Sequence, residues 1–234
     1  MTPVEVILQN RPYFEDFITR SVYHSNAIEG STLSYAETYA IIWNDNDFKV
    51  RATARELYEA INLKYAMSYI IDNAGNFLTE KMIIHIGVLI NRNIDEIDGY
   101  RTIPVQIRGA EHIPPAPELV RNAMMYFVYN YYKTEYDSVF DRMADTHIQF
   151  ERIHPFSDGN GRTGRALLSF ELLNNGYLPI VIPKDDRTEY FDYLAQQNRG
   201  GLADYFRKLH DREIDRAKNF GYDFQLNHER GRGR

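Results

Sequence analysis

The residues from His154 to Arg165 combine side chains and backbone that could bind phosphate. This stretch reads HPFSDGNGRTGR and holds one histidine, one carboxylate, three glycines and two arginines. Glycine lets the backbone turn so that successive N–H groups face an anion. A helix that begins near Arg162 would add unsatisfied N–H donors and the positive end of its dipole. Because Arg162 and Arg165 are three residues apart, both guanidinium groups lie on one side of a first helical turn. The segment therefore predicts a polyphosphate site.

Two further side chains could add chemistry to that site. His154 precedes the turn and could act as a general base on an incoming hydroxyl, a role that contributes about 10²–10⁴ in rate. Asp158 could hold Mg²⁺, because that ion bridges one or two carboxylates to phosphate oxygens. Each residue, taken singly, also has an ordinary structural interpretation as part of a loop or a solvated helix face. Their combination within one short segment favours phosphate chemistry.

Three familiar phosphate motifs do not account for the glycines. GNGRTG matches the dinucleotide pattern G-x-G-x-x-G, but that pattern needs a strand before it and here a helix is expected. Gly159 and Gly164 have the outer spacing of a P-loop, yet Arg165 and Ala166 stand where Lys and Ser or Thr are required. A kinase glycine loop would continue with valine on a strand. The features by which these motifs bind phosphate, which are backbone N–H groups and a helix N-terminus, are nevertheless expected in this segment.

The elements that position the segment are predicted to be helices. Apolar residues recur at helical spacing through most of the chain, and Ser34 with Glu37 has the spacing of a capping box. Thr79 is an expected N-cap, Pro117 an expected helix start, and Gly30 an expected helix end. The expected helices cover about 14–29, 35–43, 53–72, 80–92, 117–132, 137–153, 166–176, 187–197 and 202–220.

One segment has a different period. Ile103, Val105 and Ile107 alternate with other residue types, and Gly109 with its neighbours supplies a turn. Pro104 forbids a central strand, so the expected short hairpin has a free edge. The predicted fold class is all-α with one short β-hairpin.

Composition narrows the protein class. A chain of 234 residues, 44% hydrophobic with 18 Tyr and 13 Phe, can form one sizeable core. The net charge of −6 argues against nucleic-acid binding. The absence of cysteine excludes disulfides and thiolate metal sites. No membrane-length apolar run or secretory leader is visible, so we expect a soluble, cytoplasmic protein without a membrane partner.

The sequence resembles the Fic-domain family. His154-x-Phe156-x-Asp158-Gly159-Asn160-Gly161-Arg162-x-x-Arg165 is similar to the signature H-x-F-x-[D/E]-G-N-G-R-x-x-R at every specified position. SNAIEGS resembles the family's inhibitory motif, [S/T]-x-x-x-E-[G/N], and GYRTIPVQIRGAEHIPP resembles its flap hairpin. The resemblance implies one compact domain, with an N-terminal inhibitory helix in 1–33, a core in 34–210 that includes the flap at 101–113, and a C-terminal helix and basic tail in 211–234.

The resemblance also implies an activity, the transfer of AMP from ATP, with Mg²⁺, to a Ser, Thr or Tyr hydroxyl of a target protein. His154 would deprotonate that hydroxyl and Asp158 would hold Mg²⁺. Arg162 would stabilise the leaving pyrophosphate, and Arg165 would hold the γ-phosphate. The remaining implied nucleotide contacts are Gly159, Asn160, Gly161, Tyr190 and Asn198, while Phe156 would be a core anchor.

Regulation and target binding are implied in the same way. Glu29, within a motif that includes Ser25 and Gly30, would pair with Arg165 where the γ-phosphate must bind. The flap residues Ile103, Val105 and Ile107 would align the target by strand addition.

Several alternatives stay open at this stage. Relatives of the Doc toxin carry Lys at the position of Gly161 and transfer phosphate, so Gly161 favours AMP transfer. The other candidate functions are transfer from a different nucleotide, transfer of phosphocholine, and removal of AMP with help from Glu29. A non-catalytic nucleotide sensor is a further candidate. The target could be another protein or this chain itself, and a homodimer is expected from the resemblance.

Overall fold

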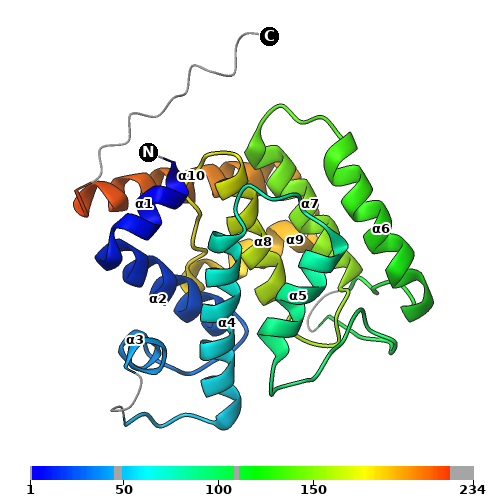
Figure 1. Cartoon of the computed structure of the whole chain (residues 1–234). Helices are drawn as coiled ribbons and strands as arrows, with labels where there is room; N and C mark the ends of the chain where they lie inside the picture. The colour runs from blue at the N-terminus through cyan, green and yellow to red at the C-terminus, as the bar shows by residue number, and fades with distance from the viewer. Residues whose placement is uncertain (1, 45–48, 108–110, 222–234) are drawn as a thin grey trace.

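The described part of the chain is helical throughout. The computed structural model describes residues 2–44, 49–107 and 111–221 (Figure 1). Within them lie ten α-helices and one 3₁₀ turn, η1, and no strand. Their bounds are α1 Pro3–Gln9, α2 Arg11–Ile28, α3 Tyr35–Trp43, α4 Ala54–Asp72, α5 Glu80–Asn91, α6 Pro117–Lys133, α7 Val139–Ile153, α8 Asn160–Asn174, η1 Lys184–Asp186, α9 Arg187–Ala195 and α10 Arg199–Asn219. The all-α prediction is confirmed.

Local capping explains where several helices begin. Ser34 and Glu37 form the expected capping box before α3, and Thr79 caps α5 by accepting from the N–H of Met82. Pro117 is the first residue of α6, where its missing N–H costs nothing. The short helix α1, capped by Thr2, was not predicted because its seven residues show too little of a helical period.

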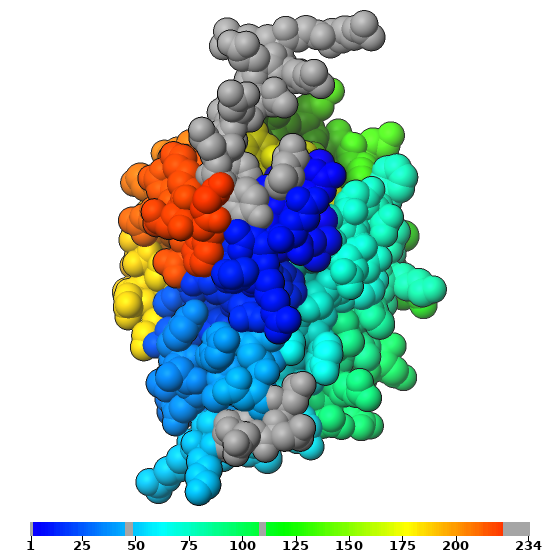
Figure 2. Space-filling model, turned by 60° about the vertical axis from the view of Figure 1, so that its left-hand side comes forward, coloured from blue at the N-terminus to red at the C-terminus, as the bar shows by residue number. Residues whose placement is uncertain are grey.

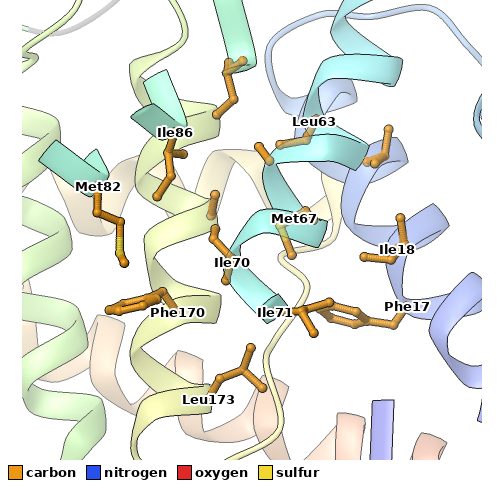
Figure 3. Close-up of a cluster of buried hydrophobic side chains, with 14 of the residues drawn as sticks. Phe17, Ile18, Leu63, Met67, Ile70, Ile71, Met82, Ile86, Phe170 and Leu173 are labelled. Carbon is orange, nitrogen blue, oxygen red and sulfur yellow. The ribbon is translucent and has the colours of Figure 1, made fainter. Parts of the chain in front are cut away.

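Helix α8 lies at the centre of the molecule. It packs against α2, α4, α5 and α7, which surround it in Figure 1. Apolar side chains from α2, α4, α5 and α8 meet in one buried cluster (Figure 3). The labelled members are Phe17, Ile18, Leu63, Met67, Ile70, Ile71, Met82, Ile86, Phe170 and Leu173. This packing holds α8, which carries part of the predicted phosphate-binding segment, against α2, α4 and α5.

The N-terminal helices and α10 lie side by side on one face (Figure 2). Tyr13 of α2 donates its hydroxyl to Glu213 of α10 at 2.7 Å, and Arg20 makes two further hydrogen bonds to the same carboxylate at 2.9 and 2.7 Å. This buried network holds α2, which carries the SNAIEG segment, against the rest of the molecule.

The predicted flap has no regular structure in its described parts. Residues 101–107 and 111–113 form no strand, and 108–110, which contain the expected turn, lie outside the described residues. Arg101 anchors the segment, because its backbone N–H donates to the Pro155 carbonyl at 2.8 Å and its Nε to the His154 carbonyl at 2.8 Å. The hairpin therefore stays a prediction, on a segment that is hydrogen-bonded directly to His154 and Pro155.

Candidate functional site

His154 stands where α7 ends. Its backbone is left-handed, with φ of 51°, and its N–H donates to the Phe150 carbonyl. The ring Nδ1 lies 3.2 Å from the Glu151 carbonyl oxygen, so Nδ1 carries the proton and Nε2 is the nitrogen that can accept one. Burial lowers the pKa of His154 below its ordinary value. The ring is therefore neutral at pH 7, as a general base must be.

The loop after His154 is held in shape by one side-chain amide. Asn160 Oδ1 accepts from the Phe156 N–H, and Asn160 Nδ2 donates to the Phe156 carbonyl, both at 2.8 Å. Phe156 is fully buried and lies against α5, where a Cβ on Gly87 would come within 2.6 Å of its ring. Both polar atoms of the Asn160 side chain thus brace the loop, and what Asn160 offers a ligand is its backbone N–H.

The two glycines at the start of α8 serve different purposes. Gly159 has φ of 73°, a conformation that favours glycine, and is the N-cap of α8 without any side-chain cap bond. The helix begins at Asn160, two residues before Arg162, near which a helix start was expected, and six residues before the expected apolar range of 166–176. Gly161 is helical, and a Cβ on it would collide with Glu29 Oε1 and approach Arg165 Nη1 at 3.0 Å. Gly161 therefore gives room for side chains rather than freedom to the backbone.

Asp158 and Arg162 belong to a charge network that sequence patterns missed. Arg162 is buried, with Nη1 at 3.1 Å from Glu59 Oε1 and Nη2 at 3.3 Å from Asp158 Oδ1. Arg55, from the same helix as Glu59, pairs with Asp158 Oδ2. Burial alone would raise the pKa of Asp158, but the positive charges of Arg162 and Arg55 bring it below its ordinary value. Asp158 is therefore ionised at neutral pH.

Asp158 is a suitable single ligand for Mg²⁺. Its side chain is 31% exposed at a cavity, and it lies beside the uncapped N-terminus of α8. Among residues 2–44, 49–107 and 111–221, no group of three His, Cys, Asp or Glu side chains is placed to hold a metal ion. A magnesium ion here would take one carboxylate from the protein and its other ligands from phosphate oxygens and water, an arrangement that Mg²⁺ commonly adopts.

Arg165 is held by the end of α2. Its Nε donates to Ser25 Oγ at 2.9 Å, and its Nη2 donates to the Ser25 carbonyl at 3.0 Å and to Glu29 Oε1 at 2.7 Å. Burial would lower the pKa of Arg165, but the Glu29 carboxylate raises it above its ordinary value. Gly30 follows with φ of 104°, so a residue with a side chain would be strained there. The structure thus brings Ser25, Glu29 and Arg165 together.

Two adjoining cavities meet at these residues. One, of about 510 Å³, extends over Asp158, the start of α8, and Arg55. The other, of about 680 Å³, extends over Arg165 and along α9 from Arg187 to Ala195. Their linings share Glu29, Gln106, His154 and Gly161. Glu29 therefore stands at the junction of the two cavities, beside the predicted base and above the predicted phosphate site.

Two of the predicted nucleotide contacts, Tyr190 and Asn198, do not line the larger cavity. Tyr190 is fully buried, and its hydroxyl lies 2.6 Å from His147 Nε2. Asn198 caps α10 by accepting from the Gly201 N–H at 2.9 Å. The cavity wall instead contains Arg187 and Phe191, with the guanidinium 4.6 Å from the ring centroid. Helical spacing shows that one face of α9 is buried, but only packing decides which face meets the cavity.

The flap residues lie at the edge of the same region. Ile103 is 57% exposed, Val105 is half-buried, and Ile107 lines the larger cavity. Gln106, between them, lines both cavities. An irregular, partly exposed segment thus lines the same cavity as His154.

Comparisons with known proteins show which family the chain belongs to. Residues 77–172 match the model of the Fic/DOC family. The matched range ends within α8 and includes the whole signature. The chain is a Fic-domain protein. It is 33% identical over 197 residues to "Protein adenylyltransferase Fic" from Aedes aegypti, covering 81% of this chain and 39% of that protein. It is 32% identical over 226 residues to the protein of the same name from Nematostella vectensis, covering 90% and 51%.

Solved structures show the same fold. A Fic-domain-containing signaling protein from Bacteroides thetaiotaomicron superposes with a TM-score of 0.81 over 93% of both chains, at 23% identity. Fic-1 from C. elegans superposes with a TM-score of 0.76, at 26% identity, over 90% of this chain and 65% of that one. The chain spans roughly two fifths to one half of the two curated relatives named above. Among the described residues of the Fic-domain protein, no helix is both long enough and apolar enough to cross a membrane.

Proposed function

We propose that this Fic-domain protein transfers AMP from ATP to a Ser, Thr or Tyr hydroxyl of a protein, which includes the chain itself as a candidate target. The observation that carries the proposal is the meeting of a neutral histidine, an ionised aspartate, an uncapped helix N-terminus and a buried arginine at two adjoining cavities. The relatives named protein adenylyltransferase Fic support the choice of AMP transfer over other phosphate chemistry.

The reaction assigns one role to each side chain. His154 Nε2 takes the proton of the target hydroxyl, whose oxygen forms a bond to the α-phosphorus of ATP. The bond from that phosphorus to the oxygen bridging to the β-phosphate breaks, and pyrophosphate leaves with its added charge. The N–H groups of the first turn of α8, with Arg162, stabilise that charge, and Arg165 holds the γ-phosphate.

The proposed reaction includes Mg²⁺ at Asp158. When bound there, Mg²⁺ would neutralise charge on the α- and β-phosphates. Asp158 would give up its pairing with Arg55 to reach the ion. Arg55 has a second carboxylate partner, Glu59, at 2.9 Å, so its charge stays compensated.

Glu29 restrains this activity in our proposal. Its Oε1 accepts a hydrogen bond from Arg165 Nη2 at 2.7 Å. A γ-phosphate bound to Arg165 would bring a second negative group to the same guanidinium. ATP can then bind Arg165 fully only after Glu29 moves away. The flap segment with Ile103, Val105 and Ile107 would hold the target chain along its free edge, beside His154.

Intact-protein mass tests the proposal. The parent, Glu29→Gly and Glu29→Gly/His154→Ala proteins are incubated with ATP and Mg²⁺. We expect an AMP-sized gain in Glu29→Gly that the added His154→Ala change abolishes. A phosphate-sized gain would show that the protein transfers phosphate instead of AMP. An AMP-sized gain that survives His154→Ala would remove His154 as the base.

A binding measurement covers the case in which the chain does not modify itself. Titration of Glu29→Gly with ATP, and with GTP and UTP as alternatives, gives the nucleotide preference directly. Tight binding of GTP or UTP in place of ATP would contradict the choice of AMP, and no binding of any triphosphate would contradict the function as a whole.

A further inference from the structure

A second acidic residue, Glu151, lies in the larger cavity beside Arg165. It is on α7, one turn before His154, and lines the cavity that also contains Arg165 and Glu29. Its side chain is 14% exposed, and its Oε1 is shielded from solvent without a hydrogen-bond partner among the described residues. His147 Nε2 lies 3.9 Å from this Oε1 atom. The signature assigns this carboxyl no role.

The absence of a side chain on α8 makes room for this carboxyl. A Cβ on Gly164 would collide with Glu151 Oε1 and come within 3.0 Å of His147 Cε1. Glu151 therefore packs directly on the first turns of α8, next to Arg165. The guanidinium also has an unused donor, because Arg165 Nη1 is buried and has no hydrogen-bond partner in the described structure. A buried acceptor and a buried donor thus both lie unpartnered at the proposed γ-phosphate site.

The charge state of Glu151 depends on the groups around it. Burial raises the pKa of Glu151 to about 7, and the positive charge of Arg165 and the negative charge of Glu29 act on it in opposite directions. Burial lowers the pKa of His147 to about 3, so His147 is neutral and supplies no compensating charge at neutral pH. The charged or titratable groups that face Glu151 or share its cavity are Glu29, His112, His147, Arg152, His154, Arg165, Arg187, Tyr190 and Asp192.

We propose that the triphosphate binds with Glu151 protonated, so that nucleotide binding takes up a proton at this side chain. An ionised Glu151 would compete with the γ-phosphate for Arg165 and add a negative charge beside it. A protonated Glu151 leaves Arg165 to the phosphate, and its O–H can donate to an anion. This inference rests on the proposed function, because it places the γ-phosphate at Arg165.

The sign of the pH dependence follows directly. Below the pKa of Glu151 the carboxyl already carries the proton, so triphosphate binding is at full strength. As the pH rises above that value the proton must be taken up on binding, and affinity falls by up to about tenfold per pH unit. With a pKa of about 7 in the parent chain, the affinity should drop roughly tenfold between pH 6 and pH 8. Removal of Glu29, whose charge raises the pKa of Glu151, should make this drop at least as large.

Calorimetry with a non-transferable nucleotide tests this. Glu29→Gly and Glu29→Gly/Glu151→Gln are titrated with α,β-methylene-ATP at pH 6 and pH 8, and in two buffers of different ionisation enthalpy to count protons. The expected loss of affinity and the proton uptake are present in the first protein and absent in the second. The protonation of the nucleotide and of His154 also changes with pH. Because this change is the same for both proteins, it cancels in the difference between their affinities.

Three controls distinguish the possible causes. Glu29→Gly/Asp192→Asn removes an exposed carboxylate from the same cavity and should behave as Glu29→Gly. Glu29→Gly/Glu151→Asp keeps a titratable carboxyl and should keep a pH dependence. AMP, which has no terminal phosphates, should show the same change in affinity between the two pH values with and without the Glu151→Gln change.

Each contrary result has a definite meaning. The same pH dependence with and without Glu151, or a loss of AMP affinity equal to that of the triphosphate, would overturn the inference and leave the proposed function intact. No triphosphate binding to Glu29→Gly at either pH would remove the proposed function and this inference with it.

Discussion

Removal of Glu29 is the change whose effect can be followed most directly through the structure. Glu29→Gly deletes one charge-assisted hydrogen bond to Arg165 and leaves the two bonds to Ser25, so the guanidinium keeps its place. A hydrogen bond between charged groups is worth roughly 1.5–3 kcal/mol. The Arg165 side chain is only 7% exposed, but that of Glu29 is 36% exposed, which favours the lower half of this range.

This energy converts into an expected gain in function. Because 1.4 kcal/mol corresponds to a factor of ten, release of Arg165 should raise triphosphate affinity or transfer rate by roughly ten- to fortyfold. The assay is the initial rate of AMP incorporation, measured by mass, at subsaturating ATP with Mg²⁺. Glu29→Gln, which keeps the size of the side chain but loses its charge, should lie between the parent and Glu29→Gly.

A matched control comes from a second ion pair of α2. Glu15 pairs with Arg11 on the surface at 2.7 Å, and Glu15→Gln should leave the rate unchanged. If Glu29→Gly binds ATP but transfers AMP no faster than the parent, the restraint by Glu29 is refuted. An equal gain in Glu15→Gln would show that loss of negative charge, rather than release of Arg165, is the cause.

Two further substitutions and one pH profile test the scaffold and the base. Gly87→Ala should lower the free energy of unfolding by about 1–2 kcal/mol in urea titrations, because its Cβ would meet the Phe156 ring. The higher helix propensity of alanine offsets only part of that cost. An unchanged urea midpoint would contradict the tight contact. Glu213→Ala should cost about 3 kcal/mol by the same measurement, since it leaves Arg20 buried without its main partner; a loss below 1 kcal/mol would show that the network is unimportant. Because burial lowers the pKa of His154, kcat/KM of Glu29→Gly should fall on the acid side only below the ordinary imidazole value of about 6.5; an acid limb above that value would contradict the buried base.

Local patterns predicted most of the fold and the centre of the site. The capping residues Ser34 and Thr79 and the first residue Pro117 act within a single helical turn, so neighbouring residues suffice to place those helix starts. The turn at Gly159 is local in the same sense, because its left-handed backbone is one that glycine adopts without strain. Such interactions span a few residues, and the sequence therefore determines them without reference to the rest of the molecule.

Tertiary packing decided the partners that come from distant segments. Arg55 reaches Asp158 across 103 positions of sequence, and no pattern within α4 distinguishes the face that meets the loop. Tyr190 is buried while Phe191 lines the cavity, although both are aromatic residues of one helix. Glu151 has its unusual environment because α8 presents a glycine to it. These outcomes depend on which helix faces meet, and that is settled by burial of apolar surface over the whole molecule rather than by the residues next to each site.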